Sequence, residues 1–288
     1  MTLPSPAPRG QQGLAIAAVI VAILSLQGGA SLAKQLFPVV GAQGAVSLRL
    51  AFASLMLLAF WRPWRSRPAK GRLRWILGYG AVLGCMNLTF YMSLRTVPLG
   101  LAVALEFIGP LTVAVLGSRR AIDLLWVGMA AGGILMLLAL GPVTARIDPV
   151  GAGLSLAAGV FWGLYILLGK RAGASNPGHA AAYGALIAAA VVIPVGIAHA
   201  GTALLSPALL PLGLAVGLLT SALPYSLEML AMARMSSRTF GVLMSLEPAI
   251  GALSGFLFLQ ERLSLVQMAA VALIMVASAG VVLEPQRD

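Results

Sequence analysis

The stretch PLGLAVALEFIGPLTVAVLG, residues 98–117, places a single carboxylate in the middle of an apolar run. A helix needs about 20 mostly apolar residues to cross a bilayer, and this run is long enough. The carboxylate of Glu106 costs roughly 2.5 kcal/mol or more at the bilayer centre. Pro110 follows four residues later, and a proline removes a backbone hydrogen bond and bends or breaks its helix. A carboxylate beside a broken membrane helix predicts a polar cavity inside a helix bundle.

Nine further apolar stretches predict an all-α polytopic membrane protein. The composition is 60% hydrophobic and 9% charged, with a mean hydropathy of +0.97, whereas soluble domains average roughly 45–50% and 25%. Together with the first stretch they predict ten transmembrane helices, at 13–33, 44–61, 75–94, 98–117, 122–140, 150–169, 179–199, 208–231, 239–259 and 264–283.

Basic residues lie mostly on one side of such a ten-span chain. With the N-terminus in the cytoplasm, fourteen Lys and Arg residues fall in cytoplasmic segments, and the four that fall outside are Lys34, Arg95, Arg146 and Arg262. Cytoplasmic loops of membrane proteins carry an excess of Lys and Arg, so both termini are predicted to be cytoplasmic. Because the net charge of +11 is spread over these loops, we expect a lipid bilayer and no nucleic acid as partner.

Four landmarks recur at a nearly constant spacing along the chain. The pairs, 136 to 139 residues apart, are Lys34/Lys170, Arg95/Arg234, Pro110/Pro248 and Asp123/Glu261. This spacing predicts two five-helix repeats, residues 1–145 and 146–288. Because five is an odd number, the second repeat has the inverted orientation in the membrane. Inverted repeats place a binding site near the midplane, between the repeats.

Three glutamates and one arginine inside the predicted spans are candidates for binding a polar substrate. Glu106 is a counter-charge for an ammonium group or a proton carrier, with a structural pair to Arg49 as the alternative. Glu247 directly precedes Pro248, which biases its backbone away from the helical conformation. Its carboxylate then either points into the cavity or caps free backbone amides. Glu228, near the cytoplasmic face, binds substrate or pairs with a basic residue. Arg49 binds a carboxylate, pairs with an acid or reaches outward to water.

Neutral polar side chains in the spans offer hydrogen-bond donors and acceptors to the same substrate. The candidates are Gln27, Ser31, Asn87, Tyr91, Tyr225 and Ser226. For each of them the alternative is a hydrogen bond between helices. Interruptions of membrane helices mark binding sites in inverted repeats. The helix breaks are expected at Gly28, Gly29, Pro110, Pro224 and Pro248.

The sequence lacks the motifs of an enzyme or of an ATP-driven pump. Its one cysteine, Cys85, lies in the third segment, so neither a disulfide framework nor a thiolate metal site is expected. No P-loop pattern is present for ATP, and no cofactor is expected. An intramembrane enzyme acting on lipid or peptide is the alternative class. It would need a Ser/His, paired-Asp or His-rich metal constellation, which the spans lack.

Several runs of the sequence resemble the drug/metabolite transporter superfamily of EamA type. They are QGGASLAK at 27–34, VPLGLAVALEF at 97–107, SRR at 118–120, KRAG at 170–173, PLGLAV at 211–216, ALPYSLEM at 222–229, RTFG at 238–241 and EPA at 247–249. The likeness covers roughly residues 13–283. Its longer runs are similar to the branch of bacterial inner-membrane exporters of threonine and homoserine. Two positions depart from the family pattern, Leu26 where an aromatic is common and Asp123 where Glu is usual.

This resemblance implies secondary active export of small neutral amino acids, L-threonine and L-homoserine, from the cytoplasm by alternating access. It also implies a multi-pass protein of the bacterial inner membrane. The alternative on the same fold is export of a purine, an aromatic amino acid or a drug-like amine. Protons are the expected coupling ion, because Glu106 lies inside the membrane. A monomer and a homodimer both remain open.

Overall fold

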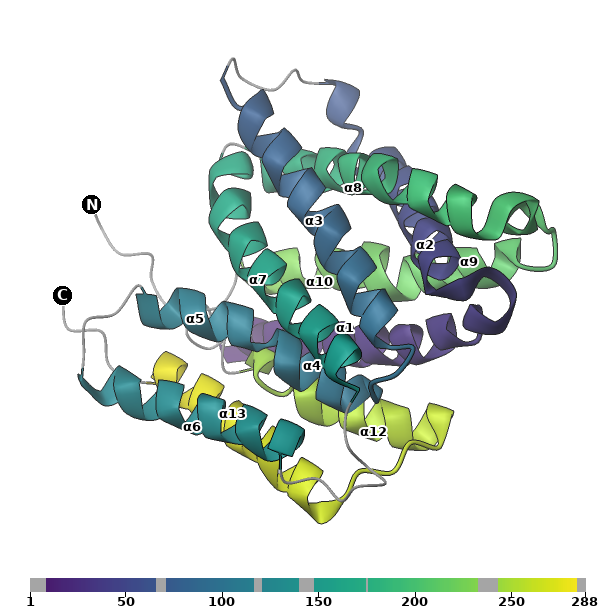
Figure 1. Ribbon diagram of the computed structural model, residues 1–288. Helices are drawn as coiled ribbons and strands as arrows, with labels where there is room; N and C mark the ends of the chain where they lie inside the picture. Colours follow the sequence, from purple (N-terminus) through teal and green to yellow (C-terminus); the bar gives the residue numbers. More distant parts are fainter. Residues whose placement is uncertain are drawn as a thin grey trace, which may run out of the picture.

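The computed structural model describes residues 9–65, 71–116, 121–139, 148–174, 176–232 and 243–283. These parts of the chain are helical and contain no strand (Figure 1). The α-helices are α1 (Arg9–Lys34), α2 (Phe37–Trp61), α3 (Leu73–Ser93), α4 (Leu99–Glu106), α5 (Ile108–Leu116), α6 (Ala121–Ala139), α7 (Pro149–Ala172), α8 (Pro177–Ala200), α9 (Leu210–Gly217), α10 (Leu223–Met232), α12 (Glu247–Leu259) and α13 (Leu265–Leu283). Three short turns, η1 (Pro63–Arg65), η3 (Gly201–Leu205) and η4 (Leu218–Ala222), connect or interrupt them.

Six of the described helical stretches are long and apolar enough to cross a membrane. They are Gly13–Lys34, Phe37–Trp61, Leu73–Ser93, Pro149–Gly169, Gly178–Leu205 and Leu210–Glu228. Four shorter apolar stretches fall within the other four predicted segments, namely Leu99–Val113, Leu125–Met136, Glu247–Leu259 and Leu265–Ala277. The expectation of an all-α membrane fold is therefore confirmed for the described part of the chain.

The second predicted segment begins earlier than its hydrophobic pattern indicates. It was expected to start at residue 44, whereas α2 starts at Phe37 with a proline in its first turn. Gly41 has φ +67° and ψ 176°, which kinks the helix inside this extra length. A residue with a side chain rarely adopts a positive φ, so the bend depends on glycine.

The fourth segment is broken beside its carboxylate. Helix α4 ends at Glu106 and α5 begins at Ile108, with Phe107 in a turn between them. Pro110 has no N–H to donate to the carbonyl of Glu106 four residues earlier, which accounts for the position of the break. A turn at Ser245 and Leu246 precedes α12 in the same way, and Ser245 lies 138 residues after Phe107.

Helix α1 corrects one expectation. It runs without interruption through Gly28 and Gly29, where a helix break was predicted. The glycines serve close packing instead, because a Cβ added at Gly29 would lie 2.5 Å from Cγ2 of Thr220 and 2.9 Å from Cβ of Leu219. Small residues let membrane helices approach closely, and this close packing outweighs the low helix propensity of glycine.

The eighth segment contains a π-helical turn rather than a sharp break. Residues Leu218–Ala222 form η4 between α9 and α10, and Pro224 lies in the first turn of α10. Because Pro224 has no N–H, the carbonyl of Thr220 four residues earlier is free to accept another hydrogen bond. Single π-turns of this kind occur frequently at functional sites.

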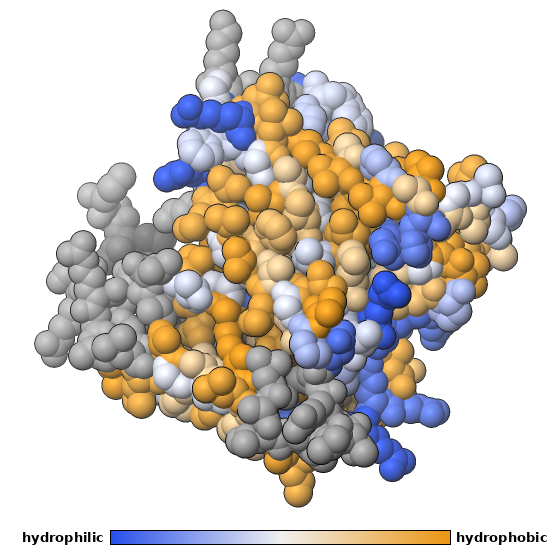
Figure 2. All heavy atoms as spheres, viewed as in Figure 1, coloured by the Kyte–Doolittle hydropathy of each residue, from blue (hydrophilic) through white to orange (hydrophobic). Residues whose placement is uncertain are grey.

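Helices from the first half of the chain pack mainly against helices from the second half. Helix α2 packs on α8, α3 on α7 and α8, α1 on α10 and α12, α4 on α12, and α6 on α13. Figure 2 shows a broadly hydrophobic surface over the face formed by α3, α7 and α8, with hydrophilic groups toward its ends. An apolar belt of this kind suits a bilayer.

The broken helix α4/α5 crosses α7 at two glycines. A Cβ added at Gly159 would lie 2.6 Å from the carbonyl oxygen of Glu106, and one added at Gly109 would overlap the carbonyl oxygen of Gly159. Backbone therefore touches backbone at this crossing, which fixes the break against α7.

We predict that Gly159→Ala destabilises the protein, because backbone at this contact cannot move aside. Overpacking of this kind costs roughly 1–3 kcal/mol. Gly153→Ala on the same helix is the matched control, since its Cβ would meet no atom within 4 Å. Thermal unfolding of both purified variants in detergent measures the difference. Equal melting temperatures for the two variants would contradict the close crossing.

Candidate functional site

Arg49 is the basic residue at the centre of the bundle. It lies on α2 with only 5% of its surface exposed. Its Nη2 donates to the carbonyl of Thr220 at 2.9 Å, and its Nε donates to Oγ of Ser221 at 3.3 Å. Both partners belong to η4, and the Thr220 carbonyl is the one that Pro224 leaves free. The partners of this buried guanidinium are thus a backbone carbonyl and a hydroxyl in a distorted helix turn, and not an acidic side chain.

Tyr91 covers one side of this guanidinium. The Arg49 Cζ lies 5.2 Å from the centroid of the Tyr91 ring, which is a cation–π geometry. The ring is fully buried, yet its hydroxyl has no hydrogen-bond partner within the described part of the chain. Phe37 also packs against Tyr91, with ring centroids 6.2 Å apart.

The carboxylates face the same region without closing an ion pair. Glu106 is 7% exposed and Glu247 2% exposed, whereas Glu228 is half-buried. Among the described residues no ion pair within 4.0 Å joins Arg49 to an acid. Electrostatic interactions link Glu106 with Arg49, and Glu247 with Glu106 and Glu228. Tyr225 interacts electrostatically with Arg49, Glu106 and Glu228.

The site is built from both halves of the chain. Glu106 is the last residue of α4, and Glu247 is the first residue of α12, so one carboxylate closes a helix and the other opens one. A negative charge is favoured at a helix N-terminus and disfavoured at a C-terminus. Glu247 therefore sits in a stabilising position, while the charge of Glu106 needs a partner from elsewhere.

Unpartnered polar atoms gather among the predicted site residues. Within the described part of the chain, Gln27 Oε1, Tyr91 Oη and Glu247 Oε1 are buried and accept or donate no hydrogen bond. Buried polar groups are nearly always satisfied, and each exception calls for a specific explanation. Gln27 and Glu247 both belong to the packed pair α1 and α12. A ligand that brings its own donors and acceptors would satisfy such atoms.

Three of the predicted site residues bond within their own helix instead. Ser31 donates to the carbonyl of Gln27 at 3.1 Å, and Ser226 donates to the carbonyl of Ala222 at 2.6 Å. The amide of Asn87 donates to the carbonyl of Leu83 at 2.8 Å. Short polar side chains in helices commonly bond back to the preceding turn. The hydrogen bonds between helices that were the alternative for these residues are not among those the structure shows.

Thr220 and Ser221 are site residues that the sequence reading missed. Neither carries a charge or an unusual neighbour, but both lie three to four residues before Pro224. Pro224 was the signal that could have identified Thr220, because a proline has no N–H and leaves the carbonyl four residues before it free. Arg49 was expected to pair with an acid, bind substrate or reach outward, and its burial excludes the last of these.

A second polar contact lies at the end of α1. The Nζ of Lys34 is 2.6 Å from Oε1 of Glu261, and the backbone N–H of Leu99 donates to Oε2 of the same carboxylate at 2.8 Å. This is the one ion pair within 4.0 Å among the described residues. It joins the end of α1 to the start of α4 and to the segment after α12.

The buried polar centre around Arg49 combines free N–H donors with carboxylates. No group of three or more His, Cys, Asp or Glu side chains lies close enough for a metal in the described ranges. The guanidinium of Arg49 has five N–H groups, of which two are used. A molecule with one carboxylate and one ammonium group would need donors such as those of Arg49 and acceptors such as Glu106 and Glu247.

Comparisons with known proteins identify the family of this chain. The model of the EamA-like transporter family matches residues 149–283. The threonine/homoserine exporters RhtA of Escherichia coli strain K12 and of Salmonella typhimurium strain LT2 are each 51% identical over 275 residues, covering 96% of this chain and 93% of the relative. The chain belongs to the EamA-like transporter family. The expectation that it is a transporter and not an enzyme is thereby confirmed.

A solved structure carries the same fold. A crystal structure that is 21% identical in sequence aligns with a TM-score of 0.61, covering 93% of this EamA-like chain and 97% of its own. At this identity the likeness concerns the fold alone.

We predict that Tyr91→Phe leaves the stability of this EamA-like protein unchanged or raises it. A buried hydroxyl without a partner costs roughly 1–3 kcal/mol, which the substitution removes. Tyr79→Phe is the matched control, because the Tyr79 hydroxyl donates to that of Tyr165 at 3.2 Å and its loss costs about 1 kcal/mol. Thermal unfolding compares the two. A loss in Tyr91→Phe as large as in Tyr79→Phe would show that the hydroxyl has a structural partner.

Proposed function

We propose that this protein exports L-threonine and L-homoserine from the cytoplasm across the bacterial inner membrane, as a secondary active transporter. The observation that carries the proposal is the 51% identity over 96% of the chain to exporters of these two amino acids. The polar centre supports it, because an amino acid needs donors for its carboxylate and acceptors for its ammonium group.

In the bound state, Arg49 receives the substrate carboxylate through the N–H groups that Thr220 and Ser221 leave free. The Tyr91 ring covers this guanidinium, and its unpartnered hydroxyl donates to the same carboxylate. Glu106 and Glu247 accept from the ammonium group. A bidentate or charge-assisted hydrogen bond is about twice as strong as a neutral one, so these contacts dominate the affinity.

The architecture we propose has ten transmembrane spans in two inverted five-helix repeats, residues 1–145 and 146–288, with both termini in the cytoplasm. The packing supports it, because the main helix contacts are symmetric between the two repeats. If each helix is replaced by its counterpart in the other repeat, the same set of contacts results. Contact α3 on α7 exchanges with α1 on α10, while α2 on α8, α4 on α12 and α6 on α13 exchange with themselves. Helix α1 also begins, and α13 ends, on the same side of the molecule (Figure 1).

Transport by alternating access requires that each end of the cavity opens in turn. We propose that the ion pair Lys34–Glu261 and the Leu99 amide bond close the outer end, an orientation that the excess of basic residues on the opposite side supports. Beside it, the Gly151 amide and the Thr96 hydroxyl donate to Asp148, which lowers the pKa of that carboxyl. In the repeat, Lys170 and Asp123 are the counterparts of Lys34 and Glu261. Their side chains lie outside the described part, and we propose that they close the cytoplasmic end.

Protons are the proposed coupling ion. Two buried carboxyl groups, Glu106 and Glu247, face one buried guanidinium, Arg49, so ionisation of both would leave an excess of negative charge. An uncompensated buried charge is costly, and either a proton or the substrate ammonium group relieves it. Competition between these two cations for Glu106 is the physical basis of antiport.

The direct test is uptake of labelled L-threonine and L-homoserine into inverted membrane vesicles containing the full chain. Accumulation of both, beyond that in vesicles without the protein, is expected. Absence of accumulation of either amino acid would overturn the proposed substrate. Accumulation of a purine or a drug-like amine in their place would assign the other cargo that the fold permits.

We predict that Glu106→Gln abolishes the stimulation of this uptake by an inside-acid pH gradient, because an amide accepts no proton at this site. Asp148→Asn is the control, since it changes an acid outside the spans and asparagine caps a helix as well as aspartate does. Uptake is measured with and without the gradient. If Glu106→Gln responds to the gradient like the parent, Glu106 is not the coupling site.

We also predict that Glu261→Gln opens the closed end more often. Loss of a partly exposed ion pair costs about 1 kcal/mol, which corresponds to about a fivefold larger open population. A cysteine at buried Ser31, in a chain whose Cys85 is replaced by serine, reports opening through its reaction with an impermeant maleimide. Arg262→Gln, the exposed neighbour, is the control. Equal labelling rates for parent and Glu261→Gln would contradict the closing role.

A further inference from the structure

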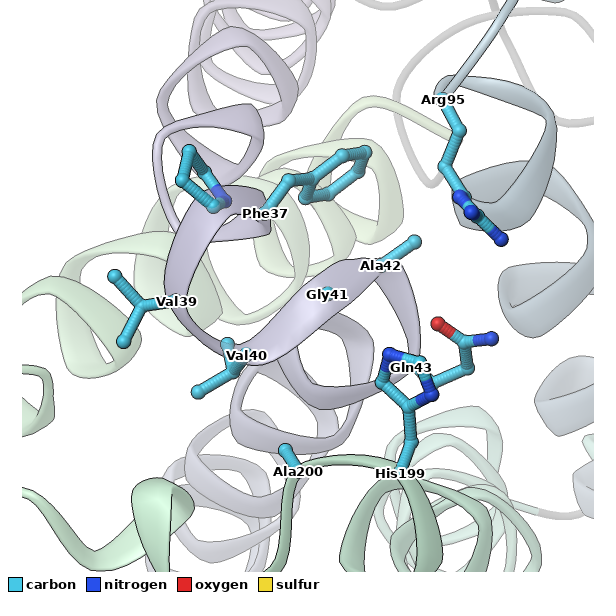
Figure 3. Close-up of a pocket in the computed structure, with 10 residues that line it drawn as sticks. Phe37, Val39, Val40, Gly41, Ala42, Gln43, Arg95, His199 and Ala200 are labelled. Carbon is cyan, nitrogen blue, oxygen red and sulfur yellow. The ribbon is translucent and has the colours of Figure 1, made fainter.

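A second polar cavity lies apart from the central site, where α2, α3 and α8 come together. It has a volume of about 300 Å³ and is lined by the first turns of α2, by Arg95 after α3, and by His199 at the end of α8 (Figure 3). In the proposed topology all three of these ends lie on the outer side of the membrane. A free amino acid is small enough to fit a cavity of this size.

The cavity owes its shape to the kink in α2. Gly41 has φ +67°, and the imidazole of His199 packs directly over its Cα, where a Cβ would lie 2.7 Å from Cδ2 of the ring. The kink turns the chain so that the side chain of Gln43 projects between His199 and Arg95, as Figure 3 shows. A helix with an ordinary first turn would fill this space with backbone.

The polar groups around the cavity are free to bind a ligand. The side chains of Arg95 and His199 are exposed, and the structure shows no hydrogen bond or ion pair from either to another described residue. Gln43 Oε1 is buried and unpartnered. The cavity therefore offers N–H donors from Arg95 and His199 for an anionic group. Gln43 lines the same cavity, and rotation of its amide would turn the unpartnered carbonyl toward an ammonium group.

One aromatic pair separates this cavity from the central site. Phe37 lines the outer cavity, and its ring packs against that of Tyr91 at 6.2 Å between centroids. The other side of Tyr91 covers Arg49. Phe37 and Tyr91 therefore form a continuous line of contacts from the outer cavity to Arg49.

We infer that this outer cavity is a second binding site for the carboxylate and ammonium groups of a free amino acid, held by Arg95, His199 and Gln43. The site receives the solute released from the central cavity before it leaves the protein. It also gives external amino acid a place to bind and oppose export. The identity of the amino acid rests on the proposed function, whereas the site itself rests on the three side chains.

The test is equilibrium binding of labelled L-threonine to the purified full chain in lipid nanodiscs. Two equivalents per chain are expected for the parent at saturation. Arg95→Gln and His199→Gln are expected to bind only one, because loss of a charge-assisted contact weakens the outer site by at least about tenfold. Arg95→Gln changes an exposed side chain and keeps the fold, and His199→Gln keeps a side chain over Gly41. Arg262→Gln, an exposed arginine that does not line the cavity, is the control and is expected to bind two.

A matched probe checks the chemistry. L-Threoninol, which has an alcohol in place of the carboxylate, is expected to leave the outer site empty, since the Arg95 guanidinium then lacks its anionic partner. One equivalent of threonine in the parent, unchanged in Arg95→Gln, would overturn this inference and leave the proposed function intact. Two equivalents in Arg95→Gln and His199→Gln would also overturn it. No binding to any form would instead contradict the proposed substrate.

Discussion

Burial of the Arg49 guanidinium inside an apolar bundle is the constraint on which the rest of the molecule depends. Removing one partner from a buried charge typically costs 3–5 kcal/mol, so the surrounding chain must supply acceptors. Pro224 frees the carbonyl of Thr220, and the π-turn η4 directs it to Arg49. Gly29 and Gly217 let α1 and α2 approach that turn closely. Loss of the distortion would leave the charge without its main anchor.

The carboxylates are arranged around this fixed charge without neutralising it. Glu106 ends one half-helix and Glu247 begins another, and neither reaches Arg49 to form an ion pair. A closed ion pair would hold the cavity shut and leave nothing for a zwitterion to bind. Separation of the charges instead leaves unpaired groups such as the Tyr91 hydroxyl, which only a ligand or a change of state can satisfy. The outer cavity also has an unpaired polar group, the side-chain carbonyl of Gln43.

Much of the fold follows from the sequence, because bilayer thickness and proline chemistry are strong local constraints. The long apolar runs gave helices in the predicted segments, and the interruptions near Pro110 and Pro248 follow from the missing N–H of each proline. The kink at Gly41 was not predicted, since nothing local distinguishes that glycine from Gly28 and Gly29. The packing neighbour of each glycine determines whether the helix bends there. His199 covers Gly41, whereas η4 packs on Gly29.

The site was predictable in its charges and not in its partners. A charge in a membrane span is conspicuous, so Arg49, Glu106 and Glu247 could be named from the sequence. Partners of those charges come from segments up to 172 residues away, as with Arg49 and Ser221, and no local pattern encodes that pairing. Ser31, Asn87 and Ser226 were predicted from polarity alone, which does not show whether a side chain bonds within its own helix.

The most direct test of the central claim is an experimental structure of the full chain in lipid with L-threonine bound at saturation. The account predicts the threonine carboxylate in hydrogen-bonding contact with the Arg49 guanidinium, and the ammonium group facing Glu106 and Glu247. Arg49 bonded only to Thr220 and Ser221, with no threonine in contact with it, would contradict the account.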